Sequence, residues 1–141
     1  MAFNENDIND FVFDTLDIVA INSLVGSRIY HRHIPKGTTP TYPLIQYQNW
    51  NRWRPVKTLG NGRSHYEGSI RIIGVNVDGQ RNTNTIKSAI EDAFLSQSAT
   101  DINGATIIDL DITEYITLTE NREKSSTISM SGIILKLMVE A

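Results

Sequence analysis

Two stretches of this sequence repeat apolar residues with the period of an α-helix, and the segments around them alternate with the period of a β-strand. In the first stretch, from about Asp7 to Ile21, the apolar stripe consists of Ile8, Phe11, Val12, Leu16 and Val19. In the second, from about Thr83 to Leu95, it consists of Ile86, Ala89, Ile90, Ala93 and Phe94. Spacings of three and four residues place such side chains on one face of a helix, so we expect two helices, each buried along one side.

The remaining segments carry the signals of β-strands. Leu44–Trp50 alternates clearly, and the other candidates are Arg28–Ile34, Tyr66–Val77, Thr106–Thr119 and Thr127–Val139, with a hairpin tip or loop expected at Pro55–Arg63. Hairpin connections suit antiparallel pairs. We therefore expect an α+β fold of order α-β-β-β-α-β-β, in which two helices pack on one face of a mainly antiparallel sheet of about five strands. A chain of 141 residues has the usual size of one domain.

Composition excludes several classes of protein. The chain contains no cysteine, which excludes disulfides, zinc sites with thiolate ligands and cysteine nucleophiles. No window approaches the roughly 18 apolar residues of a membrane span. The acidic N-terminus lacks the basic segment of a secretory signal, so we expect synthesis inside the cell and no membrane partner.

Charge is distributed unevenly along the chain. Residues 1–27 carry five acidic and no Lys or Arg side chains, residues 28–81 carry nine basic and two acidic ones, and residues 82–141 carry four basic and nine acidic ones. The net charge of −3 therefore hides a basic middle between two acidic ends. Such asymmetry favours either affinity for nucleic acid or contact between a basic face of one copy and an acidic face of the next, because complementary charge selects partner and register.

The stretch Asn49–Pro55, NWNRWRP, holds both tryptophans of the chain. On a strand, Trp50, Arg52 and Arg54 would face one way and Trp53 the other. A stacking platform for bases needs its aromatic side chains on one face of a basic groove, so this split argues against nucleic-acid binding. Tryptophan and arginine are also enriched at the energetic centres of interfaces. We expect one tryptophan to pack under the sheet and the other to reach a neighbour; packing of both in the core stays an alternative.

No pattern of catalytic residues stands out. The chain has no G-x-S-x-G motif, and Gly60-Asn61-Gly62 lacks the Lys-Ser/Thr of a phosphate-binding loop. His31 and His33 would point the same way on a strand, but zinc needs three or four ligands. Asp109 and Asp111 share a predicted strand face, which is more typical of a solvated surface than of acid–base chemistry. We expect no enzyme, no catalytic residue, no metal and no cofactor; a metal-dependent enzyme at the histidines is the weakest alternative.

Three local patterns follow one another in an order known from one protein family. After the first amphipathic helix comes Ile21–Tyr30, INSLVGSRIY, and after a proline-containing loop comes Tyr42–Gln48, YPLIQYQ. The second helix, Thr83–Leu95, follows a strand that ends near Val77. In these features the chain resembles the tail-completion, or tail-terminator, proteins of tailed bacteriophages. The resemblance covers residues 8–95; beyond Asn103 only the order of elements matches, and the segment 49–64 is heavier than the family's short polar segment.

The resemblance implies a structural virion protein with one tail-terminator-like domain over residues 1–141. Such proteins form a ring, commonly a hexamer, that ends the tail tube and joins it to the head-side connector. The implied partners are other copies of the chain, the tail-tube protein, a connector or neck protein, and genomic DNA that passes through without sequence-specific binding. Assembly would take place in the host bacterial cytoplasm, and the protein would end in the tail or neck of the virion.

Two sets of residues are candidates for this assembly. A head-to-tail ring needs two different patches on each subunit, and the basic middle and acidic ends supply them. The expected subunit or ring interface comprises Phe13, Trp50, Arg52, Trp53 and Arg54. The expected lumen-facing acids, which would repel DNA phosphates, are Asp109, Asp111 and Glu114.

Two alternatives stay open for the function. Another neck or head–tail connector ring protein would use the same surfaces. A small nucleic-acid-binding module is less favoured, and it would use Arg52, Trp53, Arg54, Lys57 and Arg63.

Overall fold

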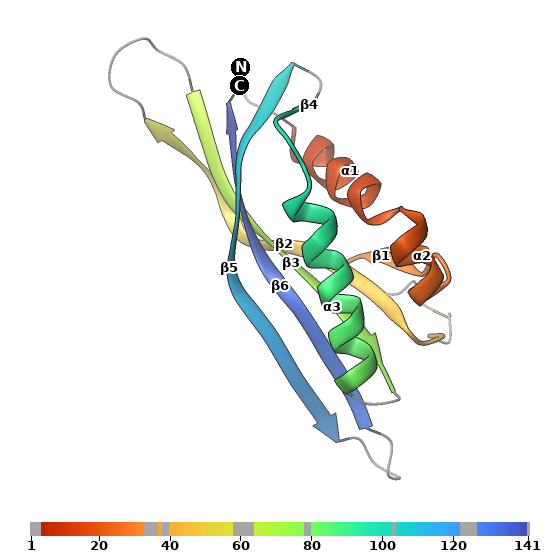
Figure 1. Ribbon diagram of the computed structural model, residues 1–141. Coiled ribbons are helices and arrows are strands. Elements are labelled where there is room, and N and C mark those ends of the chain that lie inside the picture. Colours follow the sequence, from red (N-terminus) through yellow and green to blue (C-terminus); the bar gives the residue numbers. More distant parts are fainter. Residues whose placement is uncertain are drawn as a thin grey trace.

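Within the residues that it describes, the computed structural model places three helices against one face of a six-stranded sheet (Figure 1). These residues are 4–32, 37, 40–57, 64–77, 80–102, 104–121 and 127–140. The helices are α1 (Glu5–Leu16), α2 (Val19–Val25) and α3 (Gln80–Leu95). The strands are β1 (Ile29–His31), β2 (Leu44–Lys57), β3 (Ser64–Asn76), β4 (Thr100–Ile102), β5 (Ala105–Asn121) and β6 (Thr127–Glu140).

The sheet is mixed, with strand order β1-β2-β3-β6-β5-β4. Every neighbouring pair is antiparallel except β1 and β2, which run parallel. The predicted α+β class and mainly antiparallel sheet are confirmed. The predicted count of five strands and two helices, and with it the order of elements, is wrong, because α2 is a separate helix and β4 is too short to show alternation in the sequence.

The first helix ends earlier than its apolar stripe predicts. The side chain of Asn4 caps α1 by accepting a hydrogen bond from the backbone N–H of Asn6. At the other end, the carboxylate of Asp17 accepts a 2.8 Å hydrogen bond from the side chain of Asn22, and Ile18 is extended before α2 begins. Short polar side chains that bond locally compete with continuation of a helix. Val19, which the sequence assigned to the buried stripe, is therefore 86% exposed.

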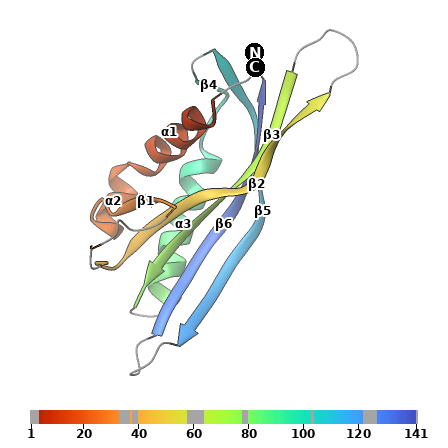
Figure 2. The same ribbon diagram turned by 180° about the vertical axis from the view of Figure 1, so that it is seen from behind.

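The main core lies between the helices and one face of the sheet. Buried side chains of the three helices pack there against alternate residues of the central strands, such as Ile72 of β3 and Leu135 of β6. Because side chains alternate along a strand, the residues between them point to the other face. No helix of the described chain covers that face, and Figure 2 views the sheet from this side.

We call this second surface the open face. Its members on β2 and β3 are Leu44, Gln46, Gln48, Trp50, Asn51, Arg54, Glu67, Ser69, Arg71, Ile73 and Val75. Its members on β6 and β5 are Ile128, Met130, Ile134, Lys136, Met138, Asp109, Asp111, Glu114, Ile116 and Leu118.

Strand β2 is longer than predicted and runs through NWNRWRP to Lys57, so the loop expected from Pro55 onward begins later. Its pairing with β3 is irregular at two points between Asn49 and Arg54. Irregularities of this kind let a strand bend without ending. Pro55 is tolerated because β1 covers only Ile45–Tyr47 of the outer edge of β2, and an unpaired edge needs no N–H donor from proline.

Strand β5 slips by one residue in its pairing with β6 at Ile108 and again at Thr113. Each extra residue reverses the alternation that follows it. Strict alternation along the predicted strand Thr106–Thr119 would put Ile108, Leu110, Ile112, Ile116 and Leu118 on one face, and the structure shows that this expectation is wrong. Leu110 and Ile112 pack against the core under the helices, whereas Ile116 and Leu118 lie on the open face.

Candidate assembly surface

The two tryptophans of NWNRWRP lie on opposite faces of the sheet. Trp53 packs against the core on the helix-covered face, where its indole ring occupies the space that a Cβ at Gly68 would need. Trp50 lies on the open face and is 48% exposed, with its ring centre 5.0 Å from the guanidinium carbon of Arg71. This distance suits a cation–π interaction. One tryptophan therefore contributes to the core, while the other is available at the surface.

Three charged side chains form a network on the open face. Oε1 of Glu67 lies 3.2 Å from Nη2 of Arg54 and 3.3 Å from Nζ of Lys136. The three residues come from β2, β3 and β6, so the network joins three neighbouring strands. The hydrogen bond from Arg54, followed by the interactions with Lys136, lowers the pKa of Glu67 despite partial burial, which acts in the opposite direction. The Arg54 side chain remains 72% exposed and can also contact another molecule.

The three acids expected to face the lumen lie along β5 on this same open face. Asp109, Asp111 and Glu114 are all exposed and pair with residues of β6 that point away from the helices. Strict alternation would put Glu114 on the face opposite to the two aspartates. The extra residue at Thr113 returns it to their side.

Charge on the open face therefore differs from one side of the sheet to the other. Toward β2 and β3 it carries Arg54 and Arg71, and along β5 it carries the three acids. Along the strands, the open face also changes from charged to apolar. The apolar end lies where β2 begins and β3 ends. Its buried side chains are Leu44, Ile73, Val75 and Ile128, against which Tyr30, Tyr42, Ile116 and Met130 pack.

The remaining residues of the expected interface lie elsewhere. Phe13 is on α1, in the helical layer, and is 38% exposed. The side chain of Arg52 lies outside the described residues. Of the four interface candidates whose side chains the structure describes, Trp50 and Arg54 lie on the open face, beside the three candidate lumen acids.

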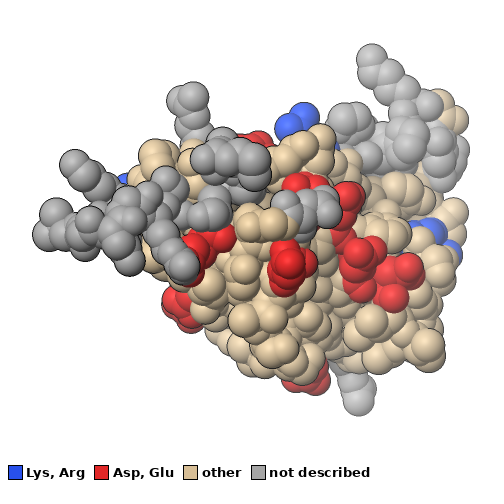
Figure 3. All heavy atoms as spheres, turned by 90° about the horizontal axis from the view of Figure 1, so that it is seen from above, with Lys and Arg blue, Asp and Glu red and all other residues tan. Residues whose placement is uncertain are grey.

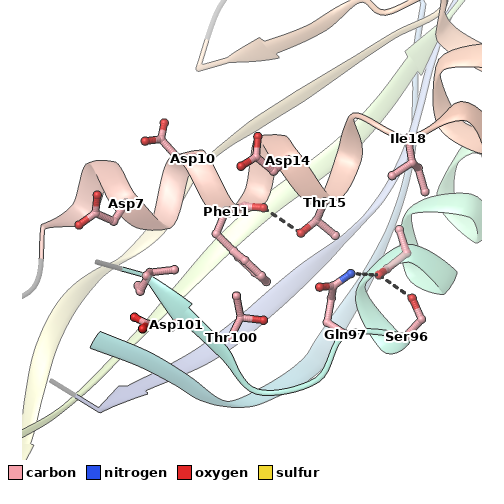
Figure 4. A pocket seen from close by; sticks show the side chains of 12 residues that line it. Asp7, Asp10, Phe11, Asp14, Thr15, Ile18, Ser96, Gln97, Thr100 and Asp101 are labelled. Carbon is pink, nitrogen blue, oxygen red and sulfur yellow. Dashed lines mark hydrogen bonds between the residues drawn. The ribbon is translucent and has the colours of Figure 1, made fainter. Parts of the chain in front are cut away.

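A groove of about 470 Å³ opens between α1 and the segment that leads from α3 into β4 (Figure 4). Its walls carry Asp7, Asp10 and Asp14 from α1 and Asp101 from β4, and Phe11 contributes an apolar surface. No Lys or Arg is among the lining residues that the structure describes. Figure 3 looks onto the end of the molecule where α1 begins and shows acidic side chains gathered there. Within the described chain, no group of three or more His, Asp or Glu side chains is placed to hold a metal ion.

His31 and His33 were the weakest candidates for a metal site. The ring of His31 stacks on Tyr47 at 5.1 Å between centroids, and His33 lies outside the described residues. Burial, and then the charges of Asp10 and Asp14, raise the pKa of Tyr47. The structure also gives no support to a stacking platform for nucleic-acid bases, because Trp50 and Trp53 lie on opposite faces of the sheet.

Sequence reasoning missed three members of this surface: Glu67, Arg71 and Lys136. Each sits on a strand that was predicted, and each alternates with buried neighbours such as Ile70 and Leu135. That alternation is a sequence signal for an uncovered polar position. What the sequence does not contain is the strand register that places Glu67 between Arg54 and Lys136.

No helix within the described residues is long and apolar enough to cross a membrane. No protein-family model matches the chain, and no curated protein matches it. Among solved structures, a chain described as "Virion of native gene transfer agent (GTA) particle" is 15% identical, with a TM-score of 0.68 over 92% of both chains. Another solved structure is 11% identical, with a TM-score of 0.51 over 99% of this chain and 96% of that one. At these identities the comparisons show a shared fold, and this chain shares its fold with a component of a virion over nearly its whole length.

Proposed function

We propose that this chain is a structural protein of a bacteriophage-type virion and that it acts there as a tail terminator. In this role, copies of the chain form a ring, most simply a hexamer, that caps the tail tube and joins it to the head-side connector or neck protein. DNA passes through the lumen of the ring. The mechanism is assembly through surfaces, and it requires no catalytic residue, cofactor or metal.

The observation that carries the proposal is the fold shared with a chain of the gene transfer agent virion over 92% of both chains. The resemblance of residues 8–95 to tail terminators supports the same role independently, because it rests on local sequence patterns. The open face adds a physical argument. A ring of identical subunits needs two unlike patches, and this face is basic toward β2 and β3 and acidic along β5.

The ring is tested by measuring the mass of the purified chain by native mass spectrometry, alone and mixed with the tail-tube protein of the same virion. We expect a closed oligomer under at least one of these conditions, and cryo-electron microscopy of the mixture should show density for it at one end of the tube. Monomers under both conditions would contradict the proposal. A ring that binds the connector but leaves the tube end free would favour a neck ring instead.

DNA binding separates the proposal from a nucleic-acid-binding module. Phosphate contacts release counterions, so a dedicated DNA-binding surface shows an affinity that falls steeply with salt. A lumen lined by Asp109, Asp111 and Glu114 would instead repel phosphates. We expect no measurable binding of short duplex DNA at physiological salt, and tight, salt-sensitive binding would favour the module.

A further inference from the structure

Among the described residues, both sides of the sheet end in strand edges that have no strand partner over most of their length. On one side, β1 covers only Ile45–Tyr47 of β2, and no described strand pairs with the outer edge from Gln48 to Lys57. On the other side, β4 covers only Ala105–Ile107 of β5, and no described strand pairs with the outer edge from Ile108 to Asn121. Unpaired N–H and C=O groups of this kind are a template for pairing with another chain.

The edge of β5 has few of the features that prevent such pairing. Protected edges are short, carry lysine or proline, or are interrupted by β-bulges. Among the described strands β5 is the longest and contains no lysine, arginine or proline, and its two irregularities both lie before Glu114. Its exposed apolar side chains are Ile108, Tyr115 and Leu118. From Glu114 onward its pairing with β6 continues without a further slip, so this half of the edge is regular.

We propose that the outer edge of β5 pairs with the outer edge of β2 of a second copy, so that the sheets of neighbouring copies join. The inference rests on the proposed self-assembly and names the surfaces that carry it. From β2 through β3 and β6 to β5 every step is antiparallel, so β5 runs opposite to β2. A neighbour generated by rotation about an axis along the strands keeps its direction, and its β2 would therefore lie antiparallel to this β5.

Charge selects this pairing over the symmetric one. A β5–β5 contact that sets residues 109–114 of the two copies opposite each other would bring Asp109, Asp111 and Glu114 of both copies together, and like charges facing each other across strands are destabilising. Pairing with β2 instead brings these acids toward Arg54, whose side chain is 72% exposed. The resulting contact joins two different edges, which is the kind of contact that closes into a ring when the rotation between copies allows it.

Disulfide crosslinking tests the pairing directly, because the chain has no cysteine of its own. The variants Glu114→Cys and Leu118→Cys place a thiol on β5, and Gln48→Cys and Asn51→Cys place one on β2. Facing residues of paired strands lie within the Cα distance that a disulfide requires. Oxidised mixtures of a β5 variant and a β2 variant should give covalent dimers, and the double variant Gln48→Cys/Glu114→Cys or Gln48→Cys/Leu118→Cys should give a ladder of multimers on a non-reducing gel.

The control is Val19→Cys, because Val19 is 86% exposed and belongs to α2 in the helical layer, not to either strand edge. Mixed with a β5 variant, it should give no covalent dimers. Light scattering on the same unoxidised samples, with thermal unfolding to verify folding, keeps the two proposals distinguishable. An oligomer that forms no β5–β2 disulfide, or in which single β5 variants crosslink to themselves, overturns the edge pairing but leaves a ring possible. Monomers alone and with the tail-tube protein overturn the proposed function as well.

Discussion

Each face of the sheet carries one tryptophan of NWNRWRP, but one ring is packed in the core and the other is exposed. On the helix-covered face, Trp53 lies over Gly68 and joins a core that also includes Phe94 of α3. On the open face, Trp50 lies over Arg71 and remains 48% exposed. The covered face is completed by the chain's own helices. The open face offers an aromatic ring, a charged network and unpaired strand edges that the described chain leaves uncovered, which is what an assembling subunit requires.

The largest effect on stability should come from the covered face. Trp53→Ala removes an aromatic ring from the core and leaves a cavity over Gly68, so we expect the free energy of unfolding to fall by about 3 kcal/mol, near the lower end for such truncations because the ring is only partly buried. Urea unfolding followed by circular dichroism measures this loss. A change below about 1 kcal/mol would mean that Trp53 is not part of the core.

Trp50→Ala should change stability little and should weaken assembly more. The cation–π contact of a partly exposed ring with Arg71 is worth about 0.5–1 kcal/mol, so the free energy of unfolding should change by no more than that. If the open face carries assembly, the same variant should weaken the oligomer measured by light scattering. Leu95→Ala, at an exposed position of α3, is the matched control and should leave assembly intact. An assembly loss no larger than that of Leu95→Ala would remove Trp50 from the interface.

A smaller, pH-dependent effect should come from the charged network of the open face. Arg54 and Lys136 lower the pKa of Glu67 in the folded chain. The carboxylate therefore contributes stability that is present above its ordinary pKa and is lost as the pH falls through the lowered one. Glu67→Gln should be less stable than the parent chain at neutral pH, and the difference should shrink as the pH falls below the ordinary pKa of a glutamate.

Urea midpoints at neutral and acid pH measure this difference. Glu114→Gln removes a carboxylate of the same face that lies outside the network, so it serves as the control. A deficit of Glu67→Gln that stays constant across the pH range would show that the carboxylate's charge is not what stabilises the network.

Much of the fold was predictable because its periodic elements are long. The stripe from Ile86 to Phe94 gave α3, and strand alternation placed Trp50 and Trp53 on opposite faces although β2 contains two irregularities. The predictions were wrong where a single residue determines where a helix ends or which face a strand residue occupies. Asp17 ends α1 through a local hydrogen bond, and Thr113 inserts an extra residue into β5.

The candidate surface was predictable only in part. Trp50, Arg54 and the acids of β5 were named from composition and charge, but their common location on the open face depends on register. The contacts of Arg71 with Trp50 and of Glu67 with Arg54 join different strands. No local pattern of a single sequence reports which residues of two strands stand side by side, so these pairs could not be derived before the sheet was known.

The smallest expected effect lies at the border of the covered face, where β5 meets α3. The hydroxyl of Tyr115 donates a 3.0 Å hydrogen bond to Oε1 of Glu91, and this bond is the main reason that the pKa of Tyr115 is raised. A raised pKa in the folded chain contributes stability below the ordinary value of about 10, and that stability is lost as the pH rises through the raised value. Tyr115→Phe should therefore lower the melting temperature slightly at neutral pH and should lack this part of the alkaline loss. Tyr30→Phe on the open face is the control, and identical alkaline profiles for the parent chain and Tyr115→Phe would show that the bond to Glu91 does not form in solution.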